Sequence, residues 1–282
     1  MRYIESFAND AAIQAAVENE SLGKPYIALN DETHKIDWDT KFDPRKVPMT
    51  FEIVKGGVLR VSGKGNNSVG FSYSKNNTAY VSVSTPATIN LDSGDTISFI
   101  FNLNATQTQG GNTKNLLFSC DNNLDTSVHA NVYGNLCSII YGSSWETNTG
   151  TTMNRQMRET FKNSYINGRG FCILDATKLI SPSTVGANSY REMFAGQKMM
   201  VKSPCLPAEN LEQACYFEMF SGCTALKEIT CLATYIPQNL GSTTDWVKGV
   251  PSGGTFKKAA SMTGWTTGTS GIPSGWTVID AT

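Results

Sequence analysis

Residues 190–196 read YREMFAG and residues 216–222 read YFEMFSG, so one seven-residue phrase occurs twice at a spacing of 26 residues. The dipeptide Cys-Leu follows each copy at the same distance, at residues 205–206 and 231–232. Self-similarity with a period of about 20–50 residues is the signature of stacked structural repeats. The chain is therefore predicted to contain repeat units that pack on one another.

A third, diverged copy lies upstream of these two. Residues 158–161 (RETF) resemble residues 191–194 (REMF), and an insertion around residues 181–186 separates this copy from the next. Stacked units share their core positions, because each unit buries its apolar side against its neighbours. The predicted repeat core consists of Phe161, Leu174, Tyr190, Phe194, Leu206, Tyr216, Phe220, Leu226 and Leu232.

Each unit is predicted to combine a short helix with a short strand. Apolar side chains in residues 211–220 fall at helical spacing, and Gly222 stands where a helix C-terminus favours a left-handed residue. Downstream, Leu226, Ile229 and Leu232 keep the three-residue step of a leucine-rich repeat. This pattern predicts a short α/β solenoid that resembles leucine-rich repeats.

The segment before the repeats predicts antiparallel β-structure. Short apolar or alternating runs between residues 48 and 142 are separated by Gly, Asn and Asp, and strands at such intervals are typical of a sandwich. The predicted fold class is mainly β with short helices. Its parts are a small N-terminal helix-hairpin anchor (1–45), an antiparallel β-sandwich (46–145), a short leucine-rich-repeat-like α/β solenoid (146–240) and a C-terminal β cap (241–282).

The first 45 residues have too little core to form a stable domain of their own. A helix capped at Asn9 or Asp10 is followed by a hairpin around the turn at residues 31–33, and a unit of this size is marginal alone. We therefore expect it to dock on the rest of the chain or on a partner. The side chains expected at that contact are Ile4, Phe7, Ile13, Val17, Tyr26, Ile36 and Trp38.

Composition excludes several classes of function. The net charge of −1 and the 23 Lys and Arg residues, which form no run, give little electrostatic support for nucleic-acid binding. No stretch approaches the roughly 18 apolar residues of a membrane span, so no membrane insertion is expected. The first residues also lack the apolar run of a signal peptide, which predicts a protein that does not use the usual secretory route.

The seven cysteines are an odd number, and four of them lie in the repeats: Cys205, Cys215, Cys223 and Cys231. Cys205 and Cys231 hold equivalent positions in the repeat alignment, as expected of small buried side chains that stack. Reduced core cysteines are therefore favoured over a disulfide framework.

Three tryptophans, Trp246, Trp265 and Trp276, lie in the turn-rich final segment. In the interpretation that we favour, they belong to a β cap that covers the open end of the repeats. In the other, they form a stacking platform for sugars. The sequence leaves both interpretations open.

The spacing-specific motifs of catalytic and metal sites are missing. The chain has two histidines, His34 and His129, and contains no HExxH, paired CxxC or P-loop pattern. We predict that the protein is not an enzyme and has no catalytic residues, metal or cofactor. Three alternatives are a thiol dyad of His129 with a cysteine, a glycosidase pair of carboxylates, and calcium-binding turns. The carboxylates concerned are Asp92, Asp95, Asp121 and Asp125, whose turn positions already have a local explanation.

The repeat and its downstream tail resemble the BspA-like leucine-rich-repeat proteins of gut Bacteroidetes and their bacteriophages. The match is carried by Leu206, Pro207, Ala208, Leu211, Cys215, Tyr216, Met219, Phe220, Gly222, Cys223 and Leu226 in the unit, and by Gly271, Ile272, Pro273, Gly275, Trp276, Thr277 and Val278 in the tail. It covers roughly residues 50–282 and implies a stacked leucine-rich-repeat fold. The few units and a degenerate copy (AGQKMM at 195–200 in place of SGCTAL at 221–226) argue against an extended concave binding face.

The segment KPYIALNDETHKIDWD, residues 24–39, is similar to the amino termini of virion proteins in crAss-like and related Bacteroidetes phages. This resemblance implies a structural protein of a bacteriophage virion, namely a head fibre or capsid-surface decoration, assembled in the host cytoplasm and exposed on the virion surface. It also implies that the N-terminus binds other virion proteins of the capsid or tail. Such fibres are often homotrimers, and weak contacts to host-surface polysaccharide would then add through multivalency.

Three other functions are alternatives to the head fibre. The first is a tail-associated virion protein. The second is a secreted bacterial cell-surface leucine-rich-repeat adhesin, which an upstream export signal would favour. The third is an enzyme that degrades polysaccharide, which would need two carboxylates facing one groove.

Overall fold

The computed structural model describes residues 43–64, 68–101, 115–120, 127–147, 157–163 and 171–281. The predicted anchor side chains, from Ile4 to Trp38, lie outside these ranges. The first described element is the 3-10 turn η1 (Pro44–Lys46), whose N-cap Asp43 accepts a hydrogen bond from the backbone N–H of Arg45. Residues 43–45 therefore belong to the folded body described below, because Arg45 O also accepts a hydrogen bond from Asn135 Nδ2 of a core strand.

The described chain is mainly β, which confirms the predicted class. The strands are β1 (Thr50–Lys55), β2 (Gly57–Gly63), β3 (Gly70–Lys75), β4 (Val81–Ser84), β5 (Ala87–Leu91), β6 (Thr96–Ile100), β7 (Leu116–Cys120), β8 (His129–Asn135), β9 (Cys172–Asp175), β10 (Leu179–Ile180), β11 (Lys202–Leu206), β12 (Glu228–Cys231), β13 (Thr255–Lys258) and β14 (Thr277–Asp280). The helix α3 (Ser138–Tyr141) and the 3-10 turn η4 (Gly142–Ser144) follow β8. Within the described ranges, no helix has the length and apolar character needed to cross a membrane.

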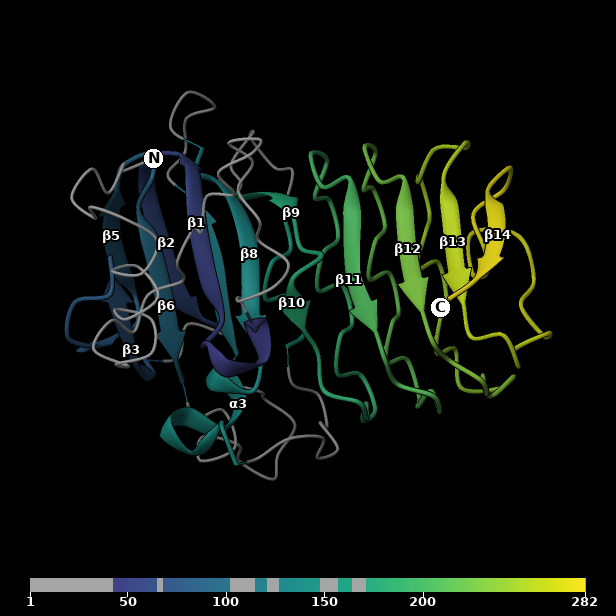
Figure 1. Ribbon diagram of the computed structural model, residues 1–282, viewed down its shortest axis with the longest axis horizontal. Coiled ribbons are helices and arrows are strands. Elements are labelled where there is room, and N and C mark those ends of the chain that lie inside the picture. Colours follow the sequence, from purple (N-terminus) through teal and green to yellow (C-terminus); the bar gives the residue numbers. More distant parts are fainter. Residues whose placement is uncertain are drawn as a thin grey trace, which may run out of the picture.

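One long sheet runs through the described chain in the order β14-β13-β12-β11-β9-β8-β1-β6-β3-β4, with β10 also paired to β8 (Figure 1). Its strands are antiparallel from β4 to β8, and each neighbouring pair from β8 to β14 is parallel. A second sheet, β5-β2-β7, is antiparallel. Strands that precede and strands that follow residues 145/146 and 240/241 pair in this one sheet.

Phenylalanine side chains join the two sheets in the antiparallel half. Alternate residues of a strand point to opposite faces, so Phe51 in β1 and Phe99 in β6 both reach the inner face of the long sheet. The ring of Phe118 in β7 lies 5.0 Å from the ring of Phe51 and 4.9 Å from that of Phe99. All three side chains are buried, and this apolar contact holds the second sheet against the first.

The helix predicted in residues 211–220 is wrong, because that segment consists of consecutive turns. Every fourth residue has a positive φ, at Ala214, Glu218 and Gly222. Each step closes with a hydrogen bond three residues back, such as Met219 N to Tyr216 O at 3.1 Å. Apolar residues four apart therefore share one face, as they would on a helix. The backbone, however, forms consecutive four-residue turns instead of an α-helix.

The remaining N–H groups of these turns bind the next unit. Tyr190 N donates to Cys215 O at 2.9 Å, and Tyr216 N donates to Ser242 O at 2.8 Å. Phe220 N donates to Trp246 O at 2.7 Å. A helix would use these donors internally, whereas stacked turns use them to join neighbours. The hydrogen bonds between units are thus what makes turns preferable to a helix here.

The same turn pattern continues beyond residue 240, in the segment predicted to be a cap. Gly241, Asp245 and Gly249 have positive φ at the same four-residue spacing. Strands β13 and β14 extend the parallel pairing from β12 (Figure 1). Residues 241–249 therefore form a further unit, in which Trp246 and Val247 stand where the preceding units have methionine and phenylalanine.

Aromatic rings form a continuous column through the stacked turns. The ring centroids of Phe161 and Phe194 lie 5.4 Å apart, and those of Phe194 and Phe220 lie 5.8 Å apart. Phe161 also lies 5.7 Å from Phe118, so the column is continuous with the core of the antiparallel half. Of the predicted repeat core, Phe161, Tyr190, Phe194, Leu206, Tyr216, Phe220 and Leu226 are buried, while Leu174 and Leu232 are half-buried.

The predicted equivalence of Cys205 and Cys231 as buried positions is wrong. A register shift in the pairing of β11 with β12 sets Leu206 opposite Cys231 and Cys205 opposite Thr230. A shift of one residue moves a side chain to the other face of a sheet, so Cys205 is exposed while Cys231 is buried. None of the seven cysteines forms a disulfide, and the other buried ones are Cys120, Cys137, Cys215 and Cys223.

Candidate functional site

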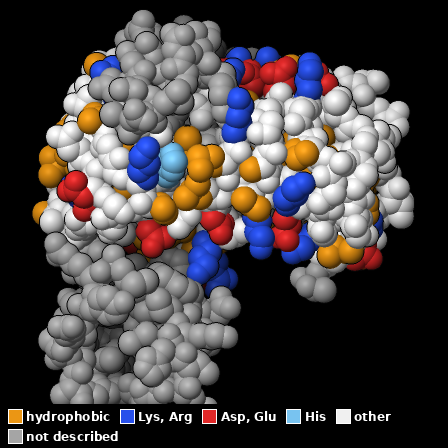
Figure 2. Space-filling model, turned by 90° about the horizontal axis from the view of Figure 1, so that it is seen from above, with side chains coloured by type: hydrophobic (Ala, Val, Ile, Leu, Met, Phe, Trp, Pro, Cys, Tyr) orange, Lys and Arg blue, Asp and Glu red, His pale blue; other side chains and the backbone are white. Residues whose placement is uncertain are grey.

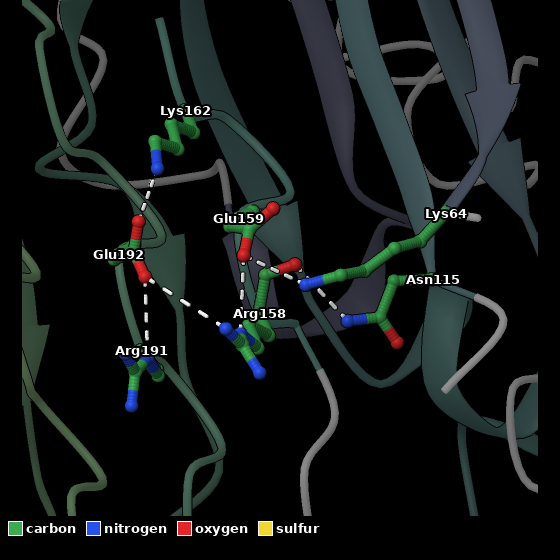
Figure 3. Close-up of polar contacts among 7 residues, drawn as sticks. All are labelled: Lys64, Asn115, Arg158, Glu159, Lys162, Arg191 and Glu192. Carbon is green, nitrogen blue, oxygen red and sulfur yellow. Dashed lines mark hydrogen bonds and ion pairs between the residues drawn. The ribbon is translucent and has the colours of Figure 1, made fainter. Parts of the chain in front are cut away.

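A cluster of charged side chains lies where the antiparallel half meets the first stacked turns (Figure 3). It consists of Lys64, Arg158, Glu159, Lys162, Arg191 and Glu192, and is called the charged cluster below. Arg158-Glu159 and Arg191-Glu192 occupy equivalent positions in adjacent units, since Glu159 N donates to Arg191 O at 3.0 Å. Lys64 reaches the cluster from the end of β2, so residues distant in sequence meet here.

Glu192 is the most enclosed member of the charged cluster, with a side chain that is 9% exposed. Its carboxylate accepts hydrogen bonds from Lys162 Nζ and from Arg191 Nε, and Arg158 Nη2 lies 3.9 Å away. Burial by itself would raise the pKa of Glu192, but the bond from Lys162 and the neighbouring positive charges outweigh it, so the pKa lies below its ordinary value. The carboxylate therefore stays ionised in a site that is mostly closed to water.

Glu159 anchors the other side of the charged cluster. Lys64 Nζ lies 2.7 Å and Arg158 Nε 3.1 Å from the Oε1 atom of Glu159. Burial lowers the pKa of Lys64, and the ion pair with Glu159 only partly offsets that effect. Lys64 thus carries its charge in a partly desolvated position, where a further anion would stabilise it.

Two buried polar atoms near the charged cluster have no hydrogen-bond partner. The Nδ2 atom of Asn115 donates to Arg158 O at 3.1 Å, but its Oδ1 atom has no partner. The hydroxyl of Thr160, next to Glu159, is also buried without a partner. Buried polar groups are usually satisfied, so this junction has unused hydrogen-bonding capacity.

We expect Glu192→Gln to destabilise the protein by about 1–3 kcal/mol at neutral pH, because charged hydrogen bonds of a buried group are lost. The folded-state pKa of Glu192 lies below its ordinary value of 4.5, so its contribution is complete above that pH and disappears as the pH falls through the lowered pKa. Urea unfolding from pH 7 to pH 3 should therefore show a constant difference from the unsubstituted protein down to about pH 4.5, and a shrinking one below.

The control for this prediction is Glu212→Gln, in an exposed turn position. That variant should stay within about 0.5 kcal/mol at every pH. If Glu192→Gln behaved like Glu212→Gln, the ion pairs of Glu192 would contribute nothing to stability.

The interpretation of the tryptophans as a sugar platform is wrong for Trp246 and Trp276. Trp246 is fully buried between the rings of Tyr216 and Trp265, and its Nε1 donates to Gly271 O at 2.7 Å. Trp276 is also buried, and its Nε1 donates to Pro251 O at 2.7 Å. Trp265 is half-buried, with its ring stacked 5.4 Å from that of Trp246. These side chains fill the core of the last units and offer no shared face to a ligand.

His129 lies opposite Cys172 in the pairing of β8 with β9, so the structure brings a histidine beside a cysteine. On one face of the molecule, Figure 2 shows a histidine side chain next to a basic side chain and hydrophobic side chains. Burial, followed by the charge of Lys55, lowers the pKa of His129, and burial raises the pKa of Cys172. An activated thiol needs the opposite shift, so the pair does not have the electrostatics of a nucleophilic dyad. His34 lies outside the described residues.

Asp95 closes the turn between β5 and β6. Its carboxylate accepts hydrogen bonds from Asp92 N and from Asn76 Nδ2, each at 2.7 Å, and pairs with Lys75 Nζ at 2.8 Å. Asp92 itself is exposed, while Asp121 and Asp125 lie outside the described residues. Within the described ranges, no group of three His, Cys, Asp or Glu side chains is arranged to hold a metal ion.

Comparisons with protein-family models, with curated proteins and with solved structures find no match to this chain. Of the residues predicted to be functional, the structure brings together those of the repeat core and buries two of the three tryptophans. The charged cluster was not predicted. Its signal in the sequence is the Arg-Glu pair repeated at residues 158–159 and 191–192.

Proposed function

We propose that this chain is a structural protein of a bacteriophage virion, namely a head fibre or capsid-surface decoration. In this proposal residues 1–45 attach it to other virion proteins and the body projects from the particle surface. The attached form is a homotrimer whose weak contacts to host-surface polysaccharide add together. The resemblances of the repeat and of residues 24–39 support this assignment.

We further infer that the two halves of the body are a β-sandwich and a leucine-rich-repeat-like solenoid. The contact of Phe118 with Phe51 and Phe99 across two sheets supports the sandwich. The parallel pairing from β11 to β14, with the stacked turns opposite, supports the solenoid. A solenoid is stabilised chiefly by contacts between neighbouring units, as in the column of Phe161, Phe194 and Phe220.

The observation that carries the proposal is the uninterrupted sheet and core that join the two halves. A projecting part of a particle must resist bending, and two domains joined by a linker would move independently. Here β8 pairs with β1 on one side and with β9 on the other, so no linker separates the halves (Figure 1). Such a body is suited to hold a binding surface at a fixed distance from its attachment.

The proposed location is tested by mass spectrometry and immunogold labelling of purified phage particles that infect gut Bacteroidetes. Gold on the capsid is the expected result. Gold on the tail would assign the chain to a tail-associated protein instead. Absence from the particles together with labelling of bacterial cells would overturn the proposal in favour of a cell-surface adhesin.

The proposed attachment is tested by a phage whose gene lacks the codons for residues 2–42. This deletion leaves Asp43 and η1, which belong to the folded body. We expect particles that lack the protein, while the truncated chain keeps its far-UV circular dichroism and cooperative unfolding. Particles that retain the truncated chain in normal amount would refute an N-terminal anchor.

A further inference from the structure

The residues that precede the acid of each unit form a row across adjacent turns. Arg158, Arg191 and Phe217 stand before Glu159, Glu192 and Glu218. Glu159 N donates to Arg191 O at 3.0 Å, and Glu192 N donates to Phe217 O at 2.8 Å. Segments joined by such bonds lie about 4.8 Å apart. The two guanidinium groups and the phenyl ring are therefore presented side by side; Arg158, Arg191 and Phe217 are called the arginine row.

Both guanidinium groups keep unused hydrogen-bond donors. A guanidinium has five N–H donors, and the side-chain hydrogen bonds of Arg158 and Arg191 to Glu159 and Glu192 use only their Nε atoms. Their terminal ends point to the same side of the charged cluster, away from Lys162 (Figure 3). The two side chains are 35% and 28% exposed, so these donors can be reached from solvent.

The arginine row is held in place before any ligand arrives. Arg158 is fixed by Glu159, and Glu192 lies 3.9 Å from its Nη2 atom. Arg191 is fixed by Glu192 on one side, and its Cζ atom lies 4.0 Å above the centre of the Phe217 ring. Arginine side chains ordered in advance lose less conformational entropy on binding, which favours affinity.

Positive charge exceeds negative charge in the charged cluster. Lys64, Arg158, Lys162 and Arg191 are four cations, whereas Glu159 and Glu192 are two carboxylates, which leaves a surplus of two positive charges. Glu218, the acid of the next unit, has no ion pair among the described residues. The whole chain has a net charge of −1, so this surplus is a local feature.

We propose that the arginine row binds anionic groups carried by a polysaccharide, either carboxylates of uronic acids or sulfate esters. Planar guanidinium groups bind such oxygen anions through paired hydrogen bonds. A polysaccharide repeats its anionic groups at intervals comparable with the step from one turn to the next. The partly exposed Phe217 ring beside the guanidinium groups offers an apolar surface to a sugar ring. A nucleic acid would need a longer basic track, and Glu159, Glu192 and Glu218 interrupt this one.

This inference rests on the proposed function for its biological source of polysaccharide, and it names the class of that ligand. The test is isothermal titration of the full-length protein with polygalacturonate, dextran sulfate and neutral dextran. We expect at least one of the two anionic polymers to bind about tenfold or more tightly than dextran, because charged hydrogen bonds are gained. The polymer that binds more tightly identifies carboxylate or sulfate as the preferred group.

The decisive variant is Arg158→Gln combined with Arg191→Gln, which should weaken binding of the anionic polymer about tenfold to a hundredfold. The matched control is Arg60→Gln, an exposed arginine of β2, which should change binding less than about twofold. Because the double variant also removes ion pairs, Phe217→Leu is measured as well. It leaves every ion pair intact, and it should weaken binding about threefold through the lost support of Arg191.

Equal binding of dextran and the anionic polymers would overturn the proposal. So would a correctly folded double variant that binds like Arg60→Gln, with folding checked by circular dichroism. Tighter binding of single-stranded oligothymidylate than of either anionic polymer would replace the polysaccharide with a nucleic acid. The titration uses purified protein and is independent of particle labelling, so failure here leaves the virion proposal standing.

Discussion

Trp246→Ala is expected to destabilise the protein by about 3–5 kcal/mol, a large part of the 5–15 kcal/mol that stabilises a typical domain. The side chain is fully buried, and its ring lies within 6.2 Å of the rings of Tyr216, Phe220, Phe256 and Trp265. Its removal opens a cavity and leaves Gly271 O without the donor of a 2.7 Å hydrogen bond. Urea unfolding followed by far-UV circular dichroism measures the change independently of tryptophan fluorescence.

Two further variants separate the causes of that loss. Trp246→Phe keeps an aromatic ring but lacks the N–H, so it should cost about 1–3 kcal/mol. Tyr235→Ala removes an aromatic side chain that is 59% exposed, and it should stay within about 0.5 kcal/mol. If Trp246→Ala cost no more than Tyr235→Ala, Trp246 would not be part of the stacked core.

Gly134→Ala is expected to cost about 3–5 kcal/mol, through a steric clash and an unfavourable backbone conformation. Gly134 has a φ of 88°, and a Cβ atom there would lie 2.1 Å from the carbonyl oxygen of Pro48. The neighbouring backbone cannot move aside easily, because Gly134 N also donates to Lys178 O and the residue pairs with Leu179. We expect a low soluble yield and an unfolding midpoint at much lower urea concentration.

The control for this variant is Gly70→Ala, in β3. The nearest atom to a Cβ at that position is Val83 O at 3.9 Å, and φ is not in the left-handed region. Its stability should change by less than about 1 kcal/mol, in the direction of greater stability, because the unfolded chain loses freedom. Similar losses for both glycines would mean that the close approach of Pro48 to β8 is not what excludes a side chain at residue 134.

The repeated phrase was sufficient to predict which aromatic residues recur, and Phe194 and Phe220 indeed have rings 5.8 Å apart. It was not sufficient to predict the backbone between them. Apolar side chains four residues apart share a face in a helix and also in consecutive four-residue turns. Only the carbonyl groups of the adjacent unit, such as Trp246 O accepting from Phe220 N, decide for turns.

The further unit at residues 241–249 is less similar in sequence to the two units that carry the repeated phrase. Gly241, Asp245 and Gly249 repeat the spacing of Asn188, Glu192 and Gly196, but tryptophan and valine replace methionine and phenylalanine at residues 246 and 247. Composition therefore favoured a separate cap, with a sugar platform as the alternative. The buried environment of Trp246 depends on Trp265 stacking on it from 19 residues downstream, which spacing within one unit does not reveal.

The sequence by itself determined the mainly β class, the recurring core positions and the pair of Arg-Glu dipeptides, because these depend on the order of residue types along one chain. Tertiary structure decided that turns form in place of helices, that the Cys205 side chain is exposed, and that Lys64 forms an ion pair with Glu159. Each of these depends on a hydrogen bond, a strand register or a charge contributed by a segment distant in sequence. The charged cluster belongs to this second group, since its members come from three separate segments and meet only when the two halves share one core.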